Sequence, residues 1–294
     1  MTRPARILTR HFPVANYALG ETLASGQAFR WREVDGGWEG VVRERWVRLV
    51  QEPTGISASI FSDEDEPSWD WLSDYLQLHL DIDAIIATFP GDQHLARAVE
   101  TSHGLRLLKQ DPWECLASFI LSSTKQIVQI QQIVGLLCER FGECIPCPAA
   151  RSAFSFPSIE KVAGLPELDL RCCKMGFRAP YLKGSAEMLI RGEVQLDRIA
   201  QMDITSARAE LMRLPGVGRK IADCVLLFAY GFHQAFPVDV WVLKAIRQLY
   251  FPRRRPNPRK ILEFTQNYFG PNAGYAQQYL FHYMRTRVGR NKGK

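Results

Sequence analysis

The chain has 294 residues, of which 46% are hydrophobic and 23% are charged. This composition is typical of a globular protein with a sizeable core and excludes a largely disordered chain. Lys and Arg total 37 while Asp and Glu total 31, and the net charge of +6 suits a polyanionic partner such as DNA without indicating one. No window has the apolar length of a membrane span, and the first residues lack a signal-peptide pattern. We expect a protein that works inside the cell, away from membranes.

Residues 1–110 have the pattern of a small antiparallel sheet. Their sequence contains three short strand-like runs, at Ala28–Trp31, Trp38–Val42 and Trp46–Gln51. Asp35-Gly36-Gly37 lies between the first two runs and is a turn signal. A helix or two is expected beside the sheet, around Trp69–Leu80 and Ile82–Thr88.

The pattern becomes helical at residue 111 and stays so to residue 294. Asp111 can cap a helix with its carboxylate, Pro112 suits the first turn, and Glu114 stands where a capping box places an acid. Apolar residues then recur at helical spacing. Further helices are expected at about 126–141, 158–164, 180–190, 206–213, 218–230, 240–250, 258–267 and 273–286. The predicted fold class is α+β, with an N-terminal antiparallel sheet domain at 1–110 and a mostly helical region at 111–294.

Two glycines between predicted helices mark a tight hairpin at Leu214-Pro215-Gly216-Val217-Gly218. Glycines allow a sharp turn and a close approach of the backbone to another molecule. The N–H groups that begin the second helix can then bind a phosphate, whatever the base sequence. Gly216, Val217 and Gly218 are therefore candidate DNA-binding residues. A plain corner between two helices is the alternative interpretation of the glycines alone.

Lys220 and Asp239 follow this hairpin and are the candidate catalytic pair. Lys220 lies just inside the second helix, and Asp239 comes in Phe236-Pro237-Val238-Asp239 before another helical run. A lone lysine is usually a solvated charge, and a lone aspartate before a helix is usually its cap. The order of hairpin, lysine and aspartate favours a catalytic pair over both alternatives.

Several motifs in this order resemble the 8-oxoguanine DNA glycosylase branch of the helix-hairpin-helix (HhH-GPD) glycosylase superfamily. They are S-G-Q-A-F-R-W at Ser25–Trp31, D-P-W-E-C-L at Asp111–Leu116, L-P-G-V-G-R-K at Leu214–Lys220, K-I-A-D-C at Lys220–Cys224, P-V-D at Pro237–Asp239 and A-G-Y-A-Q at Ala273–Gln277. The matches span roughly residues 7 to 285. The resemblance implies a bifunctional DNA glycosylase and AP lyase of base excision repair, with its active site in a cleft before the hairpin.

This resemblance also implies a mechanism. The enzyme flips 8-oxoguanine, and other oxidised purines by extension, out of duplex DNA. The amine of Lys220 attacks C1′, displaces the base and forms a Schiff base that permits β-elimination. Asp239 stabilises the cationic character of the sugar.

Five further residues are expected around the flipped base. The resemblance implies that the Gly26 carbonyl accepts the N7 hydrogen, that Cys224 and Phe281 sandwich the base, and that Gln277 reads its Watson–Crick edge; Pro237 belongs to the same group. The alternatives are a turn glycine at Gly26, ordinary core residues at Cys224 and Phe281, and a solvated side chain at Gln277.

The chain departs from the well-known eukaryotic members at residues expected to contact DNA. Thr124 stands at the position of the residue that fills the gap left by the base, and Gln129 replaces an arginine that checks for cytosine. Only Arg178 keeps a matching basic residue. We expect a relaxed preference for the opposite base. Trp241 replaces a histidine, and either a phosphate contact or a packing role is compatible with it.

Neither a metal nor a cofactor is expected. The seven cysteines, an odd number, indicate reduced thiols. None follows Cys224, so the four C-terminal cysteines of iron–sulfur glycosylases are missing. Cys144 and Cys147 have zinc-ligand spacing, but no second pair exists to complete a site.

Two other functions remain open at the level of sequence. One is a monofunctional alkyl-purine DNA glycosylase, in which Asp239 activates water and no lysine is needed. The other is a catalytically silent DNA-binding module that uses the hairpin alone. Both lysine and aspartate are present, which favours the bifunctional enzyme, and we expect it to act as a monomer on double-stranded DNA.

Overall fold

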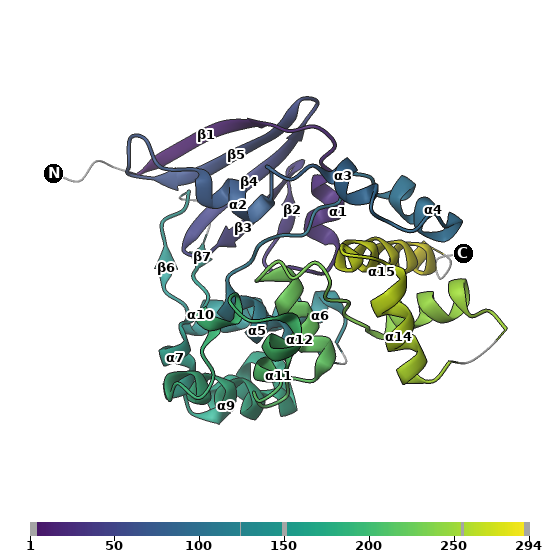
Figure 1. Cartoon of the computed structure of the whole chain (residues 1–294). Coiled ribbons are helices and arrows are strands. Elements are labelled where there is room, and N and C mark those ends of the chain that lie inside the picture. The colour runs from purple at the N-terminus through teal and green to yellow at the C-terminus, as the bar shows by residue number, and fades with distance from the viewer. Residues whose placement is uncertain (1–4, 124, 149–151, 254–255, 291–294) are drawn as a thin grey trace.

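A five-stranded antiparallel sheet forms the N-terminal part of the protein (Figure 1). The computed structural model describes residues 5–123, 125–148, 152–253 and 256–290. The strands are β1 (Arg6–Pro13), β2 (Arg32–Val34), β3 (Gly37–Val42), β4 (Arg45–Glu52) and β5 (Gly55–Ser62), in the spatial order β1-β5-β4-β3-β2. Residues Ile56, Ala58 and Ile60 of β5 alternate into the core. This alternation was a signal for β5, which the sequence analysis did not predict.

The predicted turn at Asp35-Gly36 is confirmed, but the predicted strand before it is wrong. Asp35 and Gly36 have φ of +48° and +71°, the backbone that a two-residue hairpin between twisted strands requires. Ala28–Trp31 is irregular, and β2 begins only after it. Its side chains do not alternate between two environments along one strand. Phe29 instead enters the core of the helical region, while Ala28 and Trp31 enter the core of the sheet.

Four helices lie in the part of the chain before residue 111: α1 (Leu19–Ala24), α2 (Asp70–Leu76), α3 (Ile82–Ile86) and α4 (Gln93–Thr101). Helices α1 and α2 pack in the core of the sheet, whereas α3 and α4 pack in the core of the helical region. The two expected helices are confirmed as α2 and α3, although both are shorter than predicted. The sequence analysis did not predict α4. The cap of α4 was its signal, since Asp92 accepts hydrogen bonds from the backbone N–H groups of His94 and Leu95 at 2.9 and 2.8 Å.

Every helix predicted after residue 111 is present, with shifts of a few residues at the ends. The helices are α5 (Pro112–Leu121), α6 (Ile127–Phe141), α7 (Ile159–Gly164), α8 (Glu167–Leu170), η1 (Arg171–Met175), η2 (Gly176–Arg178), α9 (Ala179–Ile190), α10 (Leu196–Ile199), α11 (Ile204–Leu211), α12 (Arg219–Phe228), α13 (Val240–Ala245), η3 (Ile246–Tyr250), α14 (Pro258–Tyr268) and α15 (Ala273–Arg290). Two short strands, β6 (Cys144–Ile145) and β7 (Ala153–Phe154), pair with each other. The α+β class is confirmed.

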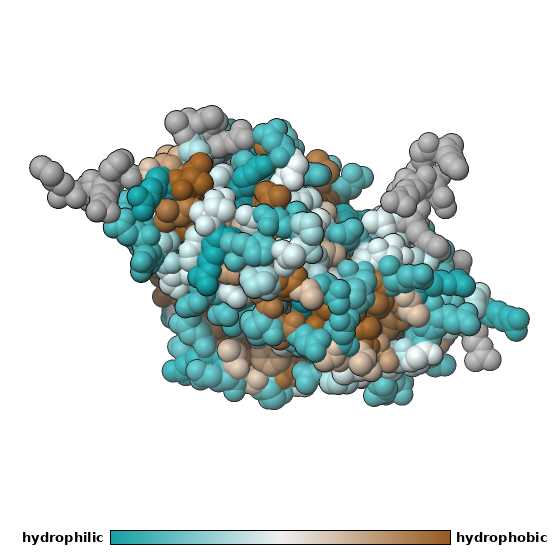
Figure 2. Space-filling model, turned by 90° about the horizontal axis from the view of Figure 1, so that it is seen from above, coloured by the Kyte–Doolittle hydropathy of each residue, from teal (hydrophilic) through white to brown (hydrophobic). Residues whose placement is uncertain are grey.

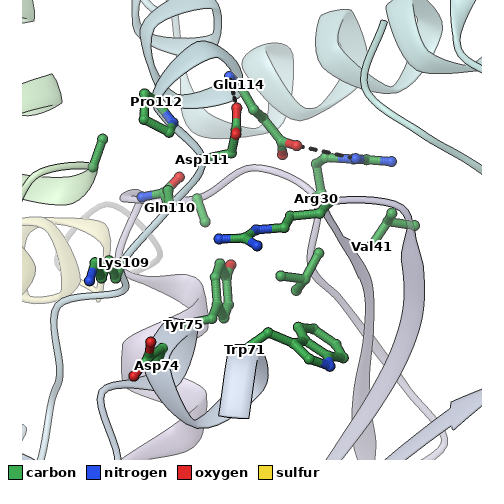
Figure 3. Close-up of a pocket in the computed structure, with 14 residues that line it drawn as sticks. Arg30, Val41, Trp71, Asp74, Tyr75, Lys109, Gln110, Asp111, Pro112 and Glu114 are labelled. Atoms are coloured by element: carbon green, nitrogen blue, oxygen red, sulfur yellow. Dashed lines mark hydrogen bonds and ion pairs between the residues drawn. The ribbon is translucent and has the colours of Figure 1, made fainter. Parts of the chain in front are cut away.

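The start of α5 is capped as expected, with one correction. The carboxylate of Asp111 accepts the backbone N–H of Glu114 at 2.9 Å. Glu114 does not complete a capping box, because its carboxylate lies 3.4 Å from the guanidinium of Arg30. Burial raises the pKa of Glu114, and the neighbouring Arg30 lowers it. Figure 3 shows this pair at the edge of a crevice where α2 faces the start of α5.

None of the helices within the described ranges has the length and apolar character needed to cross a membrane. On the face seen in Figure 2, apolar patches are interrupted by polar residues.

A buried ion pair fastens the two helices of the hairpin to each other. The guanidinium of Arg208 in α11 donates to the carboxylate of Asp223 in α12 at 2.6 Å, and their side chains are 11% and 3% exposed. Arg219 lies 3.6 Å from the other oxygen of Asp223. Burial raises the pKa of Asp223, while both arginines lower it. The pair fixes α12 against α11 and so fixes the start of α12.

We expect Arg208→Met to lower the free energy of unfolding by about 3 kcal/mol, because it leaves a buried carboxylate without its closest partner. Urea unfolding measures this change. Arg191→Met is the matched control, since Arg191 pairs with Glu193 at the exposed surface and such pairs contribute about 0–1 kcal/mol. Equal losses in the two variants would contradict a special role for the buried pair.

Candidate active site

One small pocket brings together all seven residues predicted for catalysis and base binding. Its lining comes from segments far apart in the sequence: the Gly26 loop, α5, α12, the loop before α13, and α15. The lining residues are Gly26, Phe119, Lys220, Cys224, Phe228, Pro237, Asp239, Gln277, Gln278 and Phe281. Phe119, Phe228 and Gln278 were not predicted as site residues.

Lys220 enters the pocket from the first turn of α12 and is half-buried. Its Nζ lies 3.4 Å from the hydroxyl oxygen of Ser122, just after α5, and 5.0 Å from the ring centre of Phe119. An ammonium over an aromatic face is attracted by the electrons of the ring. The lysine is therefore held against α5, and it is not a freely solvated charge.

Asp239 caps α13 and also faces the pocket, so the capping alternative is correct without excluding a second role. Its Oδ1 accepts the backbone N–H groups of Trp241 and Val242 at 3.0 and 2.8 Å. Burial raises the pKa of Asp239, whereas these backbone groups and the charge of Lys220 lower it. Both backbone hydrogen bonds go to Oδ1, which leaves Oδ2 outside the cap. The ion pairs of the described chain do not include one between Asp239 and Lys220.

The Gly26 loop requires glycine for two reasons. Gly26 has φ +78°, and a Cβ added there would lie 2.6 Å from Cδ1 of Ile127, a distance that forces one of them to move. Gln278 of α15 also holds the loop, because its Nε2 donates to the carbonyl of Ser25 at 3.2 Å. Gly26 is therefore both a turn glycine and a residue that lines the pocket.

The side chain of Gln27 holds this loop on the protein interior. Gln27 has no exposed surface. Its Nε2 donates to the carbonyls of Thr22 and Arg106 at 3.0 and 2.8 Å, and its Oε1 accepts the N–H of Leu108 at 2.7 Å. The sequence analysis quoted Gln27 within a motif but assigned it no role, since a glutamine in a motif does not reveal which backbone groups surround it.

Gln277 brings an unpaired polar atom to the pocket. Its side chain is 3% exposed, so the solvated alternative is wrong. Within the described residues, its Oε1 has no hydrogen-bond partner. A buried acceptor without a partner costs about 1–3 kcal/mol, so this atom indicates a ligand that supplies a donor.

Cys224 and Phe281 form apolar parts of the lining. Cys224 is 3% exposed. Burial raises the pKa of its thiol to about 12, although Lys220 lowers it. The thiol is therefore neutral near pH 7 and offers a packing surface, not a nucleophile.

The hairpin places a helix N-terminus next to the pocket. Gly216 has φ +75°, and a Cβ added there would lie 2.8 Å from Cγ of Tyr181 in α9. Gly218 is the N-cap of α12 and has no side chain to bond the first N–H groups. A Cβ at Gly218 would meet no atom within 4 Å. Val217 between them is buried. The first N–H groups of α12 are thus available to an anion.

One of the candidate DNA-binding residues, Gln129, lies in the first turn of α6. Gln129 is exposed, and its Oε1 accepts the backbone N–H of Gln126 at 3.1 Å. The residue that replaces the expected arginine therefore also caps its own helix. Thr124 lies outside the described residues.

Arg178 and Trp241 are more enclosed than a simple surface contact would require. Arg178 is 2% exposed, and its guanidinium donates to the carbonyls of Met175, at 3.3 Å, and of Ser123. Burial lowers the pKa of Arg178. Trp241 is half-buried in the first turn of α13, with Nζ of Lys244 5.7 Å from its ring centre. Arg178 is thus brought next to the predicted gap-filling segment but points inward.

The part of the chain that the structure describes holds no group of three or more His, Cys, Asp or Glu side chains placed to bind a metal ion.

An antiparallel sheet joined to a helical region, with a lysine and an aspartate at one pocket after a helical hairpin, defines a helix-hairpin-helix DNA glycosylase. Comparison with known families agrees with this class. Residues 117–271 match the family of HhH-GPD superfamily base excision DNA repair proteins, and residues 11–116 match the 8-oxoguanine DNA glycosylase N-terminal domain. The chain belongs to the HhH-GPD superfamily, in its 8-oxoguanine DNA glycosylase branch.

Known proteins resemble the chain over nearly its whole length. A probable N-glycosylase/DNA lyase from Methanothermobacter thermautotrophicus is 34% identical over 93% of this chain and 95% of that protein. The crystal structure of Clostridium acetobutylicum 8-oxoguanine glycosylase/lyase, in complex with DNA containing cytosine opposite 8-oxoguanine, has a TM-score of 0.88 at 31% identity and covers 98% of this chain and 100% of its own. A 3-methyladenine DNA glycosylase from Archaeoglobus fulgidus shares the fold, with a TM-score of 0.77 at 21% identity, over 94% of this chain and 98% of its own.

We expect Gly216→Ala to lower the free energy of unfolding by about 1–2 kcal/mol, because a side chain is strained in the left-handed region and would also meet Tyr181. Gly218→Ala is the control. Its backbone is extended and the space around it is open, so its stability should change by no more than about 0.5 kcal/mol. Thermal unfolding compares them, and equal losses would contradict the strain at Gly216.

Proposed function

We propose that this protein is a bifunctional DNA glycosylase and AP lyase that excises 8-oxoguanine from double-stranded DNA. The observation that carries the proposal is the pocket that holds Lys220 beside Asp239, together with Gly26, Cys224 and Gln277. The named relatives support it, since they are N-glycosylases with DNA lyase activity. Other oxidised purines are included in the proposed substrate class.

The hairpin binds the DNA backbone. The free N–H groups at the start of α12 donate hydrogen bonds to a phosphate oxygen, and Gly216, Val217 and Gly218 let the backbone of the duplex approach closely. The lesion is rotated out of the stack into the pocket. Because Lys220 is the second residue of the same helix, phosphate binding places the strand directly beside the lysine.

Lys220 supplies the nucleophile. The electron pair of its neutral amine forms a bond to C1′ while the bond from C1′ to the base breaks, and the base leaves with those electrons. Opening of the sugar gives a Schiff base between Nζ and C1′. Loss of a proton from C2′ then breaks the bond from C3′ to its oxygen, and the strand is nicked by β-elimination.

Asp239 stabilises the transition state electrostatically. Positive charge develops on the sugar as the glycosidic bond weakens, and a carboxylate in a poorly solvated site opposes it strongly. The helix cap holds Oδ1 in place, so Oδ2 is already oriented before DNA arrives.

The remaining pocket residues recognise the base. The Gly26 carbonyl accepts the hydrogen on N7 that distinguishes 8-oxoguanine from guanine, and the unpaired Oε1 of Gln277 accepts from the Watson–Crick edge. Cys224, Phe281 and Pro237 contact the faces and edge of the ring. Ile127 and Phe281 lie close to Gly26, since a Cβ added there would be 2.6 Å from Cδ1 of Ile127 and 3.5 Å from Cε1 of Phe281. These two side chains move when the base enters.

A monofunctional alkyl-purine glycosylase is the alternative for this fold. That enzyme would use Asp239 to activate water and would leave Lys220 without a chemical role. The position of the Lys220 amine inside the pocket favours the bifunctional mechanism. We also propose that the protein acts as a monomer on cellular DNA, since one chain supplies every residue that lines this pocket.

We expect Lys220→Gln to abolish base release and the covalent adduct formed with borohydride, because the amide has no electron pair that can attack C1′. The substrate is a duplex carrying 8-oxoguanine opposite cytosine, and binding of this duplex should survive. Arg219→Gln is the neighbouring control and should still form the adduct. Normal base release by Lys220→Gln would refute the role of the lysine.

The departures from the family at Thr124 and Gln129 lead us to propose a relaxed preference for the opposite base, although Arg178 keeps the matching basic residue. Gln129 caps its own helix, and the guanidinium of Arg178 is bonded to backbone carbonyls. Neither is poised to read cytosine in this arrangement.

Single-turnover excision from four duplexes, with 8-oxoguanine opposite each base, tests this preference. We expect the four rates to lie within about tenfold, since one lost hydrogen-bonding contact corresponds to about 1.4 kcal/mol or less of discrimination. A rate opposite cytosine that exceeds the others by far more would overturn the proposal.

A further inference from the structure

The Lys220 amine has a polar neighbour that the proposed mechanism does not use. Ser122 follows the last residue of α5, and its hydroxyl oxygen lies 3.4 Å from Nζ of Lys220. The same residue begins the turn toward α6, since its carbonyl accepts the N–H of Lys125 at 3.2 Å. Ser122 thus joins the catalytic lysine to the segment that is expected to fill the DNA gap.

The direction of the hydroxyl proton is fixed by a second contact. The Oγ of Ser122 donates to the carbonyl oxygen of Phe119 at 2.7 Å. A serine hydroxyl has one proton to donate and two electron pairs that accept. Because the proton is directed to Phe119, the oxygen can only accept a hydrogen bond from Lys220. It does not compete for the electron pair of the amine.

The second neighbour of Nζ restricts the lysine from another side. The ring of Phe119 is 5.0 Å away and 3% exposed. It is itself fixed by stacking on Phe228 at 5.6 Å and by an edge contact with Phe29 at 5.6 Å. A long side chain with four rotatable bonds is therefore held between a rigid ring and a rigid acceptor.

We propose that Ser122 is a positioning residue for Lys220, which holds one N–H of the amine so that its electron pair points into the pocket. Ser122 does not touch the substrate in this role and acts only through the lysine. This inference rests on the proposed function of Lys220. Its physical basis is that a small misplacement of a reacting atom lowers the rate by up to about 100-fold even when binding is unchanged.

Three variants test this role in single-turnover excision of 8-oxoguanine with saturating protein. Ser122→Ala removes the acceptor and should lower the rate constant about 10- to 100-fold. Ser122→Thr keeps the hydroxyl and should restore most of the rate. Ser123→Ala is the matched control, since the Ser123 side chain is not among the neighbours of Nζ, and it should behave as the wild type.

Two further measurements separate positioning from a structural role. The duplex affinity of Ser122→Ala should match that of the wild type, and its melting temperature should fall by only the few degrees that the lost hydrogen bond to the Phe119 carbonyl causes. In the Lys220→Gln background, Ser122→Ala should leave duplex affinity unchanged, because the residue acts through the lysine.

Each remaining outcome is decisive. A wild-type rate for Ser122→Ala, or a failure of Ser122→Thr to recover, would overturn the inference while leaving the proposed function intact. A loss of duplex affinity in the Lys220→Gln background would show that Ser122 acts on DNA and not on the lysine. Absence of a borohydride adduct with the wild-type protein would overturn the proposed function and this inference together.

Discussion

The side-chain amide of Gln27 fixes the two halves of the pocket relative to each other. Its amide is bonded to backbone groups of Thr22, between β1 and β2, and of Arg106 and Leu108, which follow the sheet. The carbonyl of Gln27 itself accepts from Gln110 at 2.8 Å, and the N–H of Gln110 donates to the carbonyl of Phe228 at the end of α12. Gly26 directly precedes Gln27, and Lys220 lies in α12, the helix that ends at Phe228. A buried, hydrogen-bonded amide therefore helps to determine how far the Gly26 carbonyl lies from the Lys220 amine.

The electrostatic arrangement depends on helix ends. The start of α12 presents N–H groups without a side-chain cap, while the start of α13 is capped by Asp239. One helix end is thereby left for an anion from outside, and the other uses an internal carboxylate. The cap fixes this carboxylate without neutralising it by an ion pair, as the proposed stabilisation of a cationic sugar requires. The Arg208–Asp223 pair fixes the orientation of α12, and so it fixes the direction in which the uncapped N–H groups of this helix point.

Much of the fold could be predicted from local signals. Asp111 and Pro112 marked the start of α5, and Asp35-Gly36 marked a hairpin, because caps and turns depend on a few neighbouring residues. Ala28–Trp31 could not be assigned in this way. It is apolar because it passes between two cores, and a short apolar run does not reveal whether its neighbours form a strand or simply fill space.

The pocket residues came from family motifs, and the structure places them together. The contacts that hold these pocket residues in place could not be predicted from the sequence. That Gln27 is bonded to Leu108, that Gln278 is bonded to Ser25, and that Ser122 meets Lys220 are contacts between residues far apart in the chain. Such contacts depend on the packing of whole helices, which no local pattern encodes. The same holds for Arg178, whose inward guanidinium follows from the carbonyls around it.

If bases enter the pocket as proposed, the side chain packed against Gly26 has a consequence for the search along DNA. Each base would first displace Ile127, which lies against Gly26, and this cost would lower the apparent affinity for all bases equally. In the proposed mechanism an undamaged guanine would recover less of that cost, because it has no hydrogen on N7 to donate to the Gly26 carbonyl. Undamaged bases would then return to the stack before bond breaking begins, and the protein would spend little time at each one. Discrimination between 8-oxoguanine and guanine would then depend on how long each base stays in the pocket, before the glycosidic bond begins to break.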